Sequence, residues 1–143
     1  MHHIAQLAGG LVLLAATAVP AAATSTVDCE AIDQSEALVE LNLSDGLPVD
    51  KPNWVRIVDG KEKWSTIPDV DNAGDDKWTP ASLLQSFDDG EVISIDVADD
   101  RQSAIIAHVR ILSANEGGTF ARVGVLHLPG RSVHPLQRNV GDE

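Results

Sequence analysis

Three consecutive segments with alternating apolar residues constrain the fold more than any other part of the sequence. They span residues 91–97, 103–112 and 119–128, and in each of them apolar and polar side chains largely alternate along the chain. Such alternation is typical of β-strands with one buried face. Polar turns separate the segments at Asp99-Asp100 and at residues 115–118. We therefore predict a three-stranded antiparallel meander.

The two faces of this predicted meander differ in polarity. With simple turn registers, one face is apolar and should lie against the core. It carries Ile93, Ile95, Val97, Ile105, Ala107, Val109, Ile111, Phe120 and Leu126. The other face is mixed, too apolar for open water and too polar for a dry core. It carries Val92, Ser94, Asp96, Ile106, His108, Arg110, Val123, Val125 and His127.

Two further segments predict helices that would pack on this sheet. Residues 28–43 are acidic and place Ile32, Val39 and Leu43 on one helical face, which indicates a long amphipathic helix. Residues 79–88 indicate a short helix, because a threonine and a proline open the segment. The predicted fold class is therefore α+β, with a curved, cone-like antiparallel β-sheet, one long helix and one short helix.

A β-hairpin should precede the short helix. Residues 54–58 and 61–67 favour strands and flank an Asp-Gly pair at positions 59–60. An Asp-Gly pair between two apolar runs is a strong signal for a two-residue turn. This turn would place Val55 opposite Trp64, as a buried cross-strand pair.

The N-terminal segment, residues 1–23, has the layout of a secretory signal peptide. An apolar block at residues 4–19 precedes an Ala-x-Ala site and is shorter than the ~20 residues that a membrane span needs. Cleavage would leave one α+β domain at residues 24–130, and we interpret residues 131–143 as a flexible C-terminal tail. We expect a periplasmic or secreted protein with no stable membrane span after cleavage. The alternative is that residues 4–19 stay attached and pack on the sheet as a helix.

Charge and cysteine content narrow the classes of partner. The chain carries 22 acidic against 10 basic residues, a formal net charge of −12, which opposes binding to nucleic acid and to anionic membrane surfaces. Cys29 is the only cysteine, so no internal disulfide can form. The aspartate before Cys29 disfavours a lipid anchor there. We predict no cofactor and no metal; the acidic run at residues 69–77 fits a solvated loop, with a weak calcium site as the alternative.

Two stretches resemble a known group of proteins. Residues 91–100 with 104–110, and residues 119–131, resemble strands of the nuclear transport factor 2-like superfamily, in its lumazine-binding and SnoaL-like branch. The likeness covers roughly residues 54–131. It implies a cone-shaped α+β fold with a pocket on the concave face of the sheet. It also implies functions such as those of ketosteroid isomerases and dehydratases of that superfamily.

Five residues are candidates for ligand binding: Asp96, His108, Arg110, His127 and Trp54. An aspartate and a histidine can share acid–base work. The assumed registers separate Asp96 from His127 by on the order of 10 Å, too far for a direct hydrogen bond. His108 and Arg110 share a strand face and can hold an anionic ligand, and Trp54 can stack on a flat one. The alternative is a solvated stripe on an ordinary sheet.

No catalytic motif stands out, so we interpret the protein as an exported, non-catalytic domain that binds a small molecule or associates with a second copy of itself. One alternative is a small hydrolyase or isomerase of the cone fold with an Asp/His pocket. Another alternative is an interaction module of the cell envelope. A pocket that encloses the polar residues favours a ligand binder or an enzyme, whereas an open, flat mixed face favours an interaction module.

Overall fold

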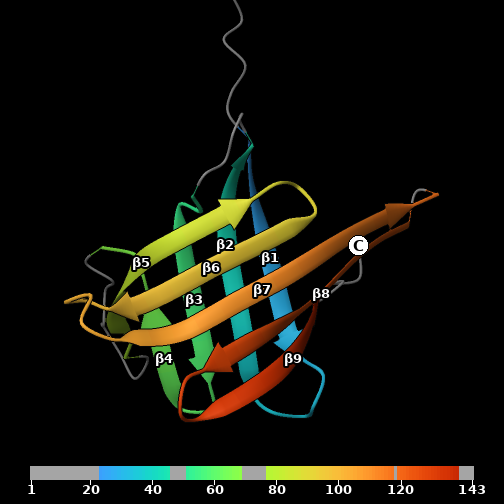
Figure 1. Cartoon of the computed structure of the whole chain (residues 1–143). Helices are drawn as coiled ribbons and strands as arrows, with labels where there is room; N and C mark the ends of the chain where they lie inside the picture. Colours follow the sequence, from blue (N-terminus) through green and yellow to red (C-terminus); the bar gives the residue numbers. More distant parts are fainter. Residues whose placement is uncertain (1–22, 46–50, 69–76, 118, 139–143) are drawn as a thin grey trace, which may run out of the picture.

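A computed structural model shows an all-β protein, which corrects the α+β prediction. It describes residues 23–45, 51–68, 77–117 and 119–138, and within these ranges the chain forms strands and no helix. The strands form one closed barrel in chain order (Figure 1). They are β1 (Ala23–Ala31), β2 (Ala37–Asp45), β3 (Trp54–Asp59), β4 (Glu62–Ser65), β5 (Thr79–Asp88), β6 (Val92–Asp99), β7 (Ile105–Glu116), β8 (Thr119–Leu128) and β9 (Ser132–Arg138).

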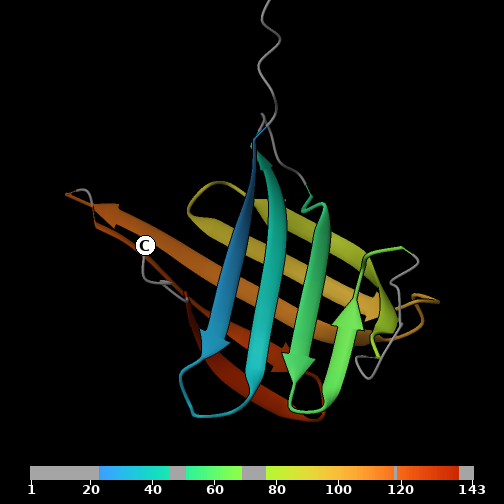
Figure 2. The ribbon, with the colours of Figure 1, turned by 180° about the vertical axis from the view of Figure 1, so that it is seen from behind.

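The barrel is flattened into two sides. Strands β1–β4 form one side and β5–β9 the other, and the strands of the two sides cross at a steep angle (Figures 1 and 2). Neighbouring strands are antiparallel, except that β4 and β5 run parallel over a short register, Trp64 with Thr79 and Ser65 with Pro80. The barrel closes where β9 pairs with both β8 and β1.

Alternate residues of the strands point inward and form one apolar core. On β6 and β7 these are the residues that the sequence assigns to the buried face, apart from Ile105, which is exposed; the side chain of Phe120 lies outside the described residues. Fully burying each such aliphatic side chain contributes about 1.5–3 kcal/mol. The core residues are Val27, Cys29, Ala37, Val39, Leu41, Leu43, Val55, Ile57, Ile93, Ile95, Val97, Ala107, Val109, Ile111, Leu126, Leu128 and Leu136.

The predicted long helix at residues 28–43 is wrong, because this segment contributes to two strands. It contains the end of β1, a connection at residues 32–36 and most of β2. Val39, Leu41 and Leu43 follow one another at every second position and all point into the core. Glu40 and Asn42, which lie between them, point outward. The same residues satisfy a helical stripe only if Leu41 is left out of the pattern.

The predicted short helix at residues 79–88 is also wrong, because this segment forms β5. The register of β5 against β6 shifts between Leu83 and Gln85, as at a β-bulge. A bulge inserts one residue and reverses the alternation beyond it. Leu83 therefore packs against the core, whereas Phe87 is exposed. The extra residue explains why the apolar spacing resembles that of a helix.

The hairpin of β3 and β4 is confirmed, with a different register. Asp59 pairs with Glu62, so the loop is Gly60-Lys61 rather than Asp59-Gly60, and Gly60 has a φ of 59°. Trp64 consequently lies opposite Ile57 instead of Val55.

The two ends of the chain bear on the predicted domain limits. The expected flexible tail is corrected over Ser132–Arg138, which forms β9. The predicted signal peptide lies, except for its last residue, in residues 1–22, outside the described residues, as does most of the acidic run at residues 69–77. Within the described ranges no helix is long and apolar enough to cross a membrane. Cys29 is buried inside the barrel.

Gly124 allows β7 and β8 to approach closely. A Cβ atom at this position would lie 2.4 Å from the backbone oxygen of Arg110 and 3.2 Å from the Cα of Ile111. Both neighbours are backbone atoms, so any larger residue would push the two strands apart. The glycine therefore fixes the spacing of the strands that carry much of the candidate site.

Candidate functional site

The outward side chains of β6, β7, β8 and β9 form a regular grid, which we call the β7–β8 face. The strand registers give three rows across the four strands. The first row is Asp96, His108, His127 and Val133. The second is Ser94, Arg110, Val125 and Pro135, and the third is Val92, Leu112, Val123 and Gln137. This face is the mixed face of the sequence prediction, extended by β9 and without Ile106, which packs against the core.

Four of the five predicted site residues meet on this face, and we call them the Asp96 cluster: Asp96, His108, Arg110 and His127. His108 Nδ1 lies 2.8 Å from Asp96 Oδ1, and Arg110 donates a hydrogen bond to the same oxygen, also over 2.8 Å. The rings of His108 and His127 stack with centroids 5.5 Å apart. The geometry thus joins Asp96 to His127 through His108, a link that the assumed registers had missed.

The hydrogen bonds of the Asp96 cluster fix its charges. Partial burial opposes ionisation of Asp96, but the hydrogen bonds from His108 and Arg110 outweigh this effect, so the pKa of the carboxyl is lowered. A carboxylate only accepts hydrogen bonds, so His108 Nδ1 must carry the proton and donate it. Arg110 also donates to the carbonyl oxygens of Ile95 and Val109, over 2.9 and 2.8 Å. Its guanidinium therefore lies folded back on the sheet.

Exposed aliphatic side chains surround the Asp96 cluster. Leu112 is 56% exposed, Val123 54%, Val125 39% and Val133 61%, although all four lie in regular strands. Phe87 on β5 pairs with Ser94 and is 55% exposed, so it continues the second row beyond β6. Single exposed apolar residues are ordinary, whereas a contiguous group of this kind marks a contact surface.

The fifth predicted residue, Trp54, lies elsewhere. It belongs to β3, on the opposite side of the barrel (Figure 2). The guanidinium of Arg56 lies 5.2 Å from the Trp54 ring and 5.0 Å from the Trp78 ring. Arg56 also lies 3.8 Å from Glu40. Trp54 therefore packs with a local cation and has no part in the Asp96 cluster.

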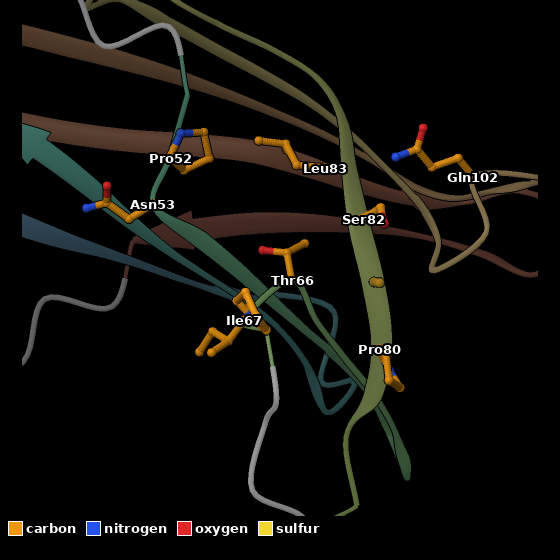
Figure 3. Close-up of a pocket in the computed structure, with 10 residues that line it drawn as sticks. Pro52, Asn53, Thr66, Ile67, Pro80, Ser82, Leu83 and Gln102 are labelled. Atoms are coloured by element: carbon orange, nitrogen blue, oxygen red, sulfur yellow. The ribbon is translucent and has the colours of Figure 1, made fainter.

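A pocket of about 530 Å³ opens at one end of the barrel, beside the parallel strands β4 and β5 (Figure 3). Its described lining includes neither Trp54 nor any member of the Asp96 cluster. The lining residues are Pro52, Asn53, Thr66, Ile67, Pro68, Pro80, Ala81, Ser82, Leu83 and Gln102. The structure thus separates its pocket from its predicted polar site.

A second histidine–carboxylate group, the His134 cluster, consists of His134, Asp33, Ser35 and Asp59. His134 is buried, and its Nδ1 lies 3.0 Å from Ser35 Oγ and 3.1 Å from Asp33 Oδ2. Its Nε2 lies 3.3 Å from Asp59 Oδ1, in ion-pair contact but without hydrogen-bond alignment. The Ser35 hydroxyl and backbone amide, together with His134, lower the pKa of Asp33 to about 2.

The His134 cluster was missed because its members lie far apart in the sequence. Asp33 and Ser35 belong to the connection between β1 and β2, Asp59 ends β3, and His134 lies in β9. One sequence signal for β9 was available. Ser132, His134 and Leu136 stand at every second position, as in a strand with one buried face, although the segment was interpreted as a tail. Within the described part of the chain, no group of three or more histidines, cysteines or acidic residues is arranged to hold a metal ion.

Comparison of the chain with family models, with curated proteins and with solved structures gives no match. The resemblance to the nuclear transport factor 2-like superfamily therefore gains no support from these comparisons. The α+β cone that it implied is contradicted by the all-β barrel.

Proposed function

We propose that this protein is an exported, non-catalytic binding domain that associates with a second copy of itself through the β7–β8 face. The observation that carries the proposal is the group of exposed aliphatic side chains around the Asp96 cluster. Apolar area removed from water contributes about 25 cal/mol per Å². An isologous contact centred on Val125 would bury Leu112, Val123 and Val133 of both copies at once.

The closed barrel favours association through a face. All nine described strands have two paired neighbours, so no described strand has an edge that is unpaired over its whole length. Unpaired backbone is confined to parts of strands, such as those of β1 and β5 beyond their short pairings with β9 and β4, and this favours contact through side chains. The β7–β8 face is suited to this contact because regular strands hold its rows in fixed positions.

The charges on this face also suit a second copy. Each chain carries a net charge of −12, which opposes association at long range. The grid of the β7–β8 face, however, contains one carboxylate, Asp96, and it is already paired with His108 and Arg110. Two such faces can therefore meet without bringing free carboxylates together. We expect added salt to strengthen the dimer, because it screens the repulsion between the remaining charges.

The catalytic alternative has less support. Asp96 and His108 form a hydrogen-bonded pair, but they lie on the outer face of the barrel, and the described lining of the pocket contains neither. Acid–base chemistry on a small molecule needs a site that holds the substrate against the reacting groups. An open sheet surface supplies a contact area instead.

Sedimentation velocity over a range of concentrations tests the proposal. We expect wild-type dimers with a Kd on the order of 10 µM or lower. Val125→Glu should raise this Kd at least about tenfold, because it places a charge at the centre of the contact. Ile32→Glu is the matched control: Ile32 is 54% exposed but lies outside the grid. A monomeric wild-type protein, or equal effects of the two variants, would overturn the proposal.

The export part of the proposal has its own test. It is supported by the apolar block and the Ala-x-Ala site at residues 1–23. The mass of the product recovered from the periplasm or the medium should correspond to a chain that begins at Thr24. A product that retains Met1 would contradict export by cleavage and would leave the association result unaffected.

A further inference from the structure

The pocket at the end of the barrel differs chemically from the rest of the molecule. The chain as a whole has a net charge of −12, yet none of the described lining residues carries an ionisable side chain. Its lining combines proline and aliphatic side chains with the neutral polar groups of Asn53, Thr66, Ser82 and Gln102. The volume of about 530 Å³ falls within the range of small-molecule sites.

Most polar groups of the pocket are already engaged within the protein. Asn53 donates to Asn42 and accepts from Ser44, over 2.7 and 2.9 Å. Thr66 Oγ1 accepts a hydrogen bond of 2.9 Å from the backbone amide of Val55. These bonds hold the two side chains in fixed positions, so they shape the wall of the pocket and offer little free hydrogen-bonding capacity.

Gln102 is the exception. Its side-chain amide has no hydrogen-bond partner among the described residues, and Figure 3 shows it extending from the connection after β6 toward β5, on the other side of the β5 ribbon from Leu83 in this view. The backbone of Gln102 has a φ of 56°, a conformation that residues other than glycine adopt at some cost. Its backbone amide donates to the carbonyl of Asp99 over 2.9 Å, which holds the turn. Among the described lining side chains, the Gln102 amide thus offers the pocket a free NH₂ donor group and a free carbonyl acceptor.

We propose that this pocket binds an uncharged small molecule that carries an amide or hydroxyl group beside an apolar ring or chain, with Gln102 as the recognition residue. A charged ligand would lose its hydration against a wall that supplies no counter-charge, at a cost of several kcal/mol. A neutral polar group loses less, and the Gln102 amide can replace its water partners. The proline rings add rigid apolar walls that need no ordering on binding.

Three matched probes test the proposal: benzamide, benzoate and benzylamine, which share a ring and differ in charge. Each is titrated into isotope-labelled protein, and amide NMR shifts are followed at about 0.15 M salt to reduce long-range charge effects. A ligand of this size should bind with a Kd on the order of millimolar. We expect benzamide to shift the amides of Thr66, Ser82 and Gln102, and the two charged probes to leave them unchanged.

Two variants and one control complete the test. Gln102→Ala should weaken benzamide binding at least about fivefold, which is about 1 kcal/mol, and Ser82→Phe should abolish it by filling the pocket. The control is Gln85→Ala. Gln85 is an exposed glutamine of β5, the strand that also carries Ser82, and its substitution should leave benzamide binding unchanged. Stronger binding of benzylamine would show that the negative field of the protein governs the site and would overturn the proposal. Absence of benzamide shifts at the pocket, or an equal response of the Gln102 and Gln85 variants, would also overturn it.

Discussion

The Asp96 cluster and the His134 cluster each pair a histidine with an aspartate, but they join very different parts of the chain. Asp96 and His108 lie on adjacent strands of one hairpin, directly opposite each other in the register. His134 instead connects β9 to the end of β3 and to the connection after β1. The His134 side chain is 10% exposed, whereas His108 is 28% exposed and Arg110 47%.

This difference separates a group that holds the fold from a group that is available for contact. Loss of the Asp96–His108 pair leaves the β6–β7 ladder in place, because backbone hydrogen bonds form that ladder. Loss of His134 removes the side chain that joins three segments near the end of the barrel, and it takes from Asp33 and Asp59 the partner that they share. Arg131, which contacts Glu62 and lies 3.8 Å from Asp59, strengthens the same end of the barrel.

The largest effect is expected from His134→Ala. The substitution should lower the free energy of unfolding by about 2–3 kcal/mol, because it removes a buried side chain together with its contacts to Asp33, Ser35 and Asp59. His108→Ala should cost less than about 1 kcal/mol, as for a partly exposed pair on the outer face of the barrel. Urea unfolding followed by tryptophan fluorescence measures both values. Equal losses would show that the two clusters do not differ in their structural role.

Cys29 offers a second, local measurement of the same difference. Burial raises the pKa of the Cys29 thiol, and in register this residue lies opposite Arg138 of β9. The native protein should therefore react slowly with iodoacetamide. His134→Ala should speed the reaction by up to about 100-fold if β9 separates from β1 more often. A rate that His134→Ala leaves unchanged would show that the pairing of β1 with β9 does not depend on His134.

Part of the acid sensitivity of the fold should come from the His134 cluster. The folded protein lowers the pKa of Asp33 from the ordinary value of 3.8 to about 2. The resulting stabilisation is therefore fully present above about pH 4 and is lost as the pH falls through about 2. Asp33→Asn should flatten the dependence of unfolding free energy on pH in that interval. Denaturation curves recorded between pH 2 and 5 measure it, and an unchanged slope in the variant would contradict this expectation.

The smallest effect is expected from Asp96→Asn. The pKa of Asp96 is lowered, so its pairs stabilise the fold above the ordinary carboxyl pKa and lose this contribution in acid. At neutral pH the substitution should cost less than about 1 kcal/mol. Glu40→Gln provides the control, since Glu40 also pairs with an arginine on an outer face. A loss as large as that of His134→Ala would assign the Asp96 cluster a role in holding the barrel.

Part of this architecture could be predicted because it depends on local alternation. The meander that contains β6, β7 and β8 and most of its buried face follow from the spacing of apolar residues. The Asp96 cluster was predicted to share one face, but its contacts depend on the register. That register is set by the connection at residues 100–104 and by an irregularity between Val97 and Ala98. Neither feature has a clear sequence signal.

The features that could not be predicted depend on distant parts of the chain. The bulge in β5 gave Leu83 and Phe87 a helix-like spacing. The acidic residues of β1 and β2 alternate with apolar ones, but they also fit one side of an amphipathic helix. Pro135 made the C-terminal segment look unstructured, because proline is rare in paired strands. In the structure Pro135 belongs to β9 and lies opposite Val125 of β8. Its carbonyl oxygen accepts a hydrogen bond from the backbone amide of Ile32.

The order of the strands has a consequence for how the chain folds. Every strand pair joins consecutive segments except β1 with β9. The consecutive pairs close short loops and can form early, whereas pairing of β1 with β9 must bring together the two ends of the domain at a larger entropic cost. We expect the barrel to assemble outward from its hairpins and to close last at Cys29 and Arg138. A nascent chain could not complete this step until β9 had emerged, so the thiol of Cys29, which is buried in the closed barrel, would remain accessible throughout synthesis.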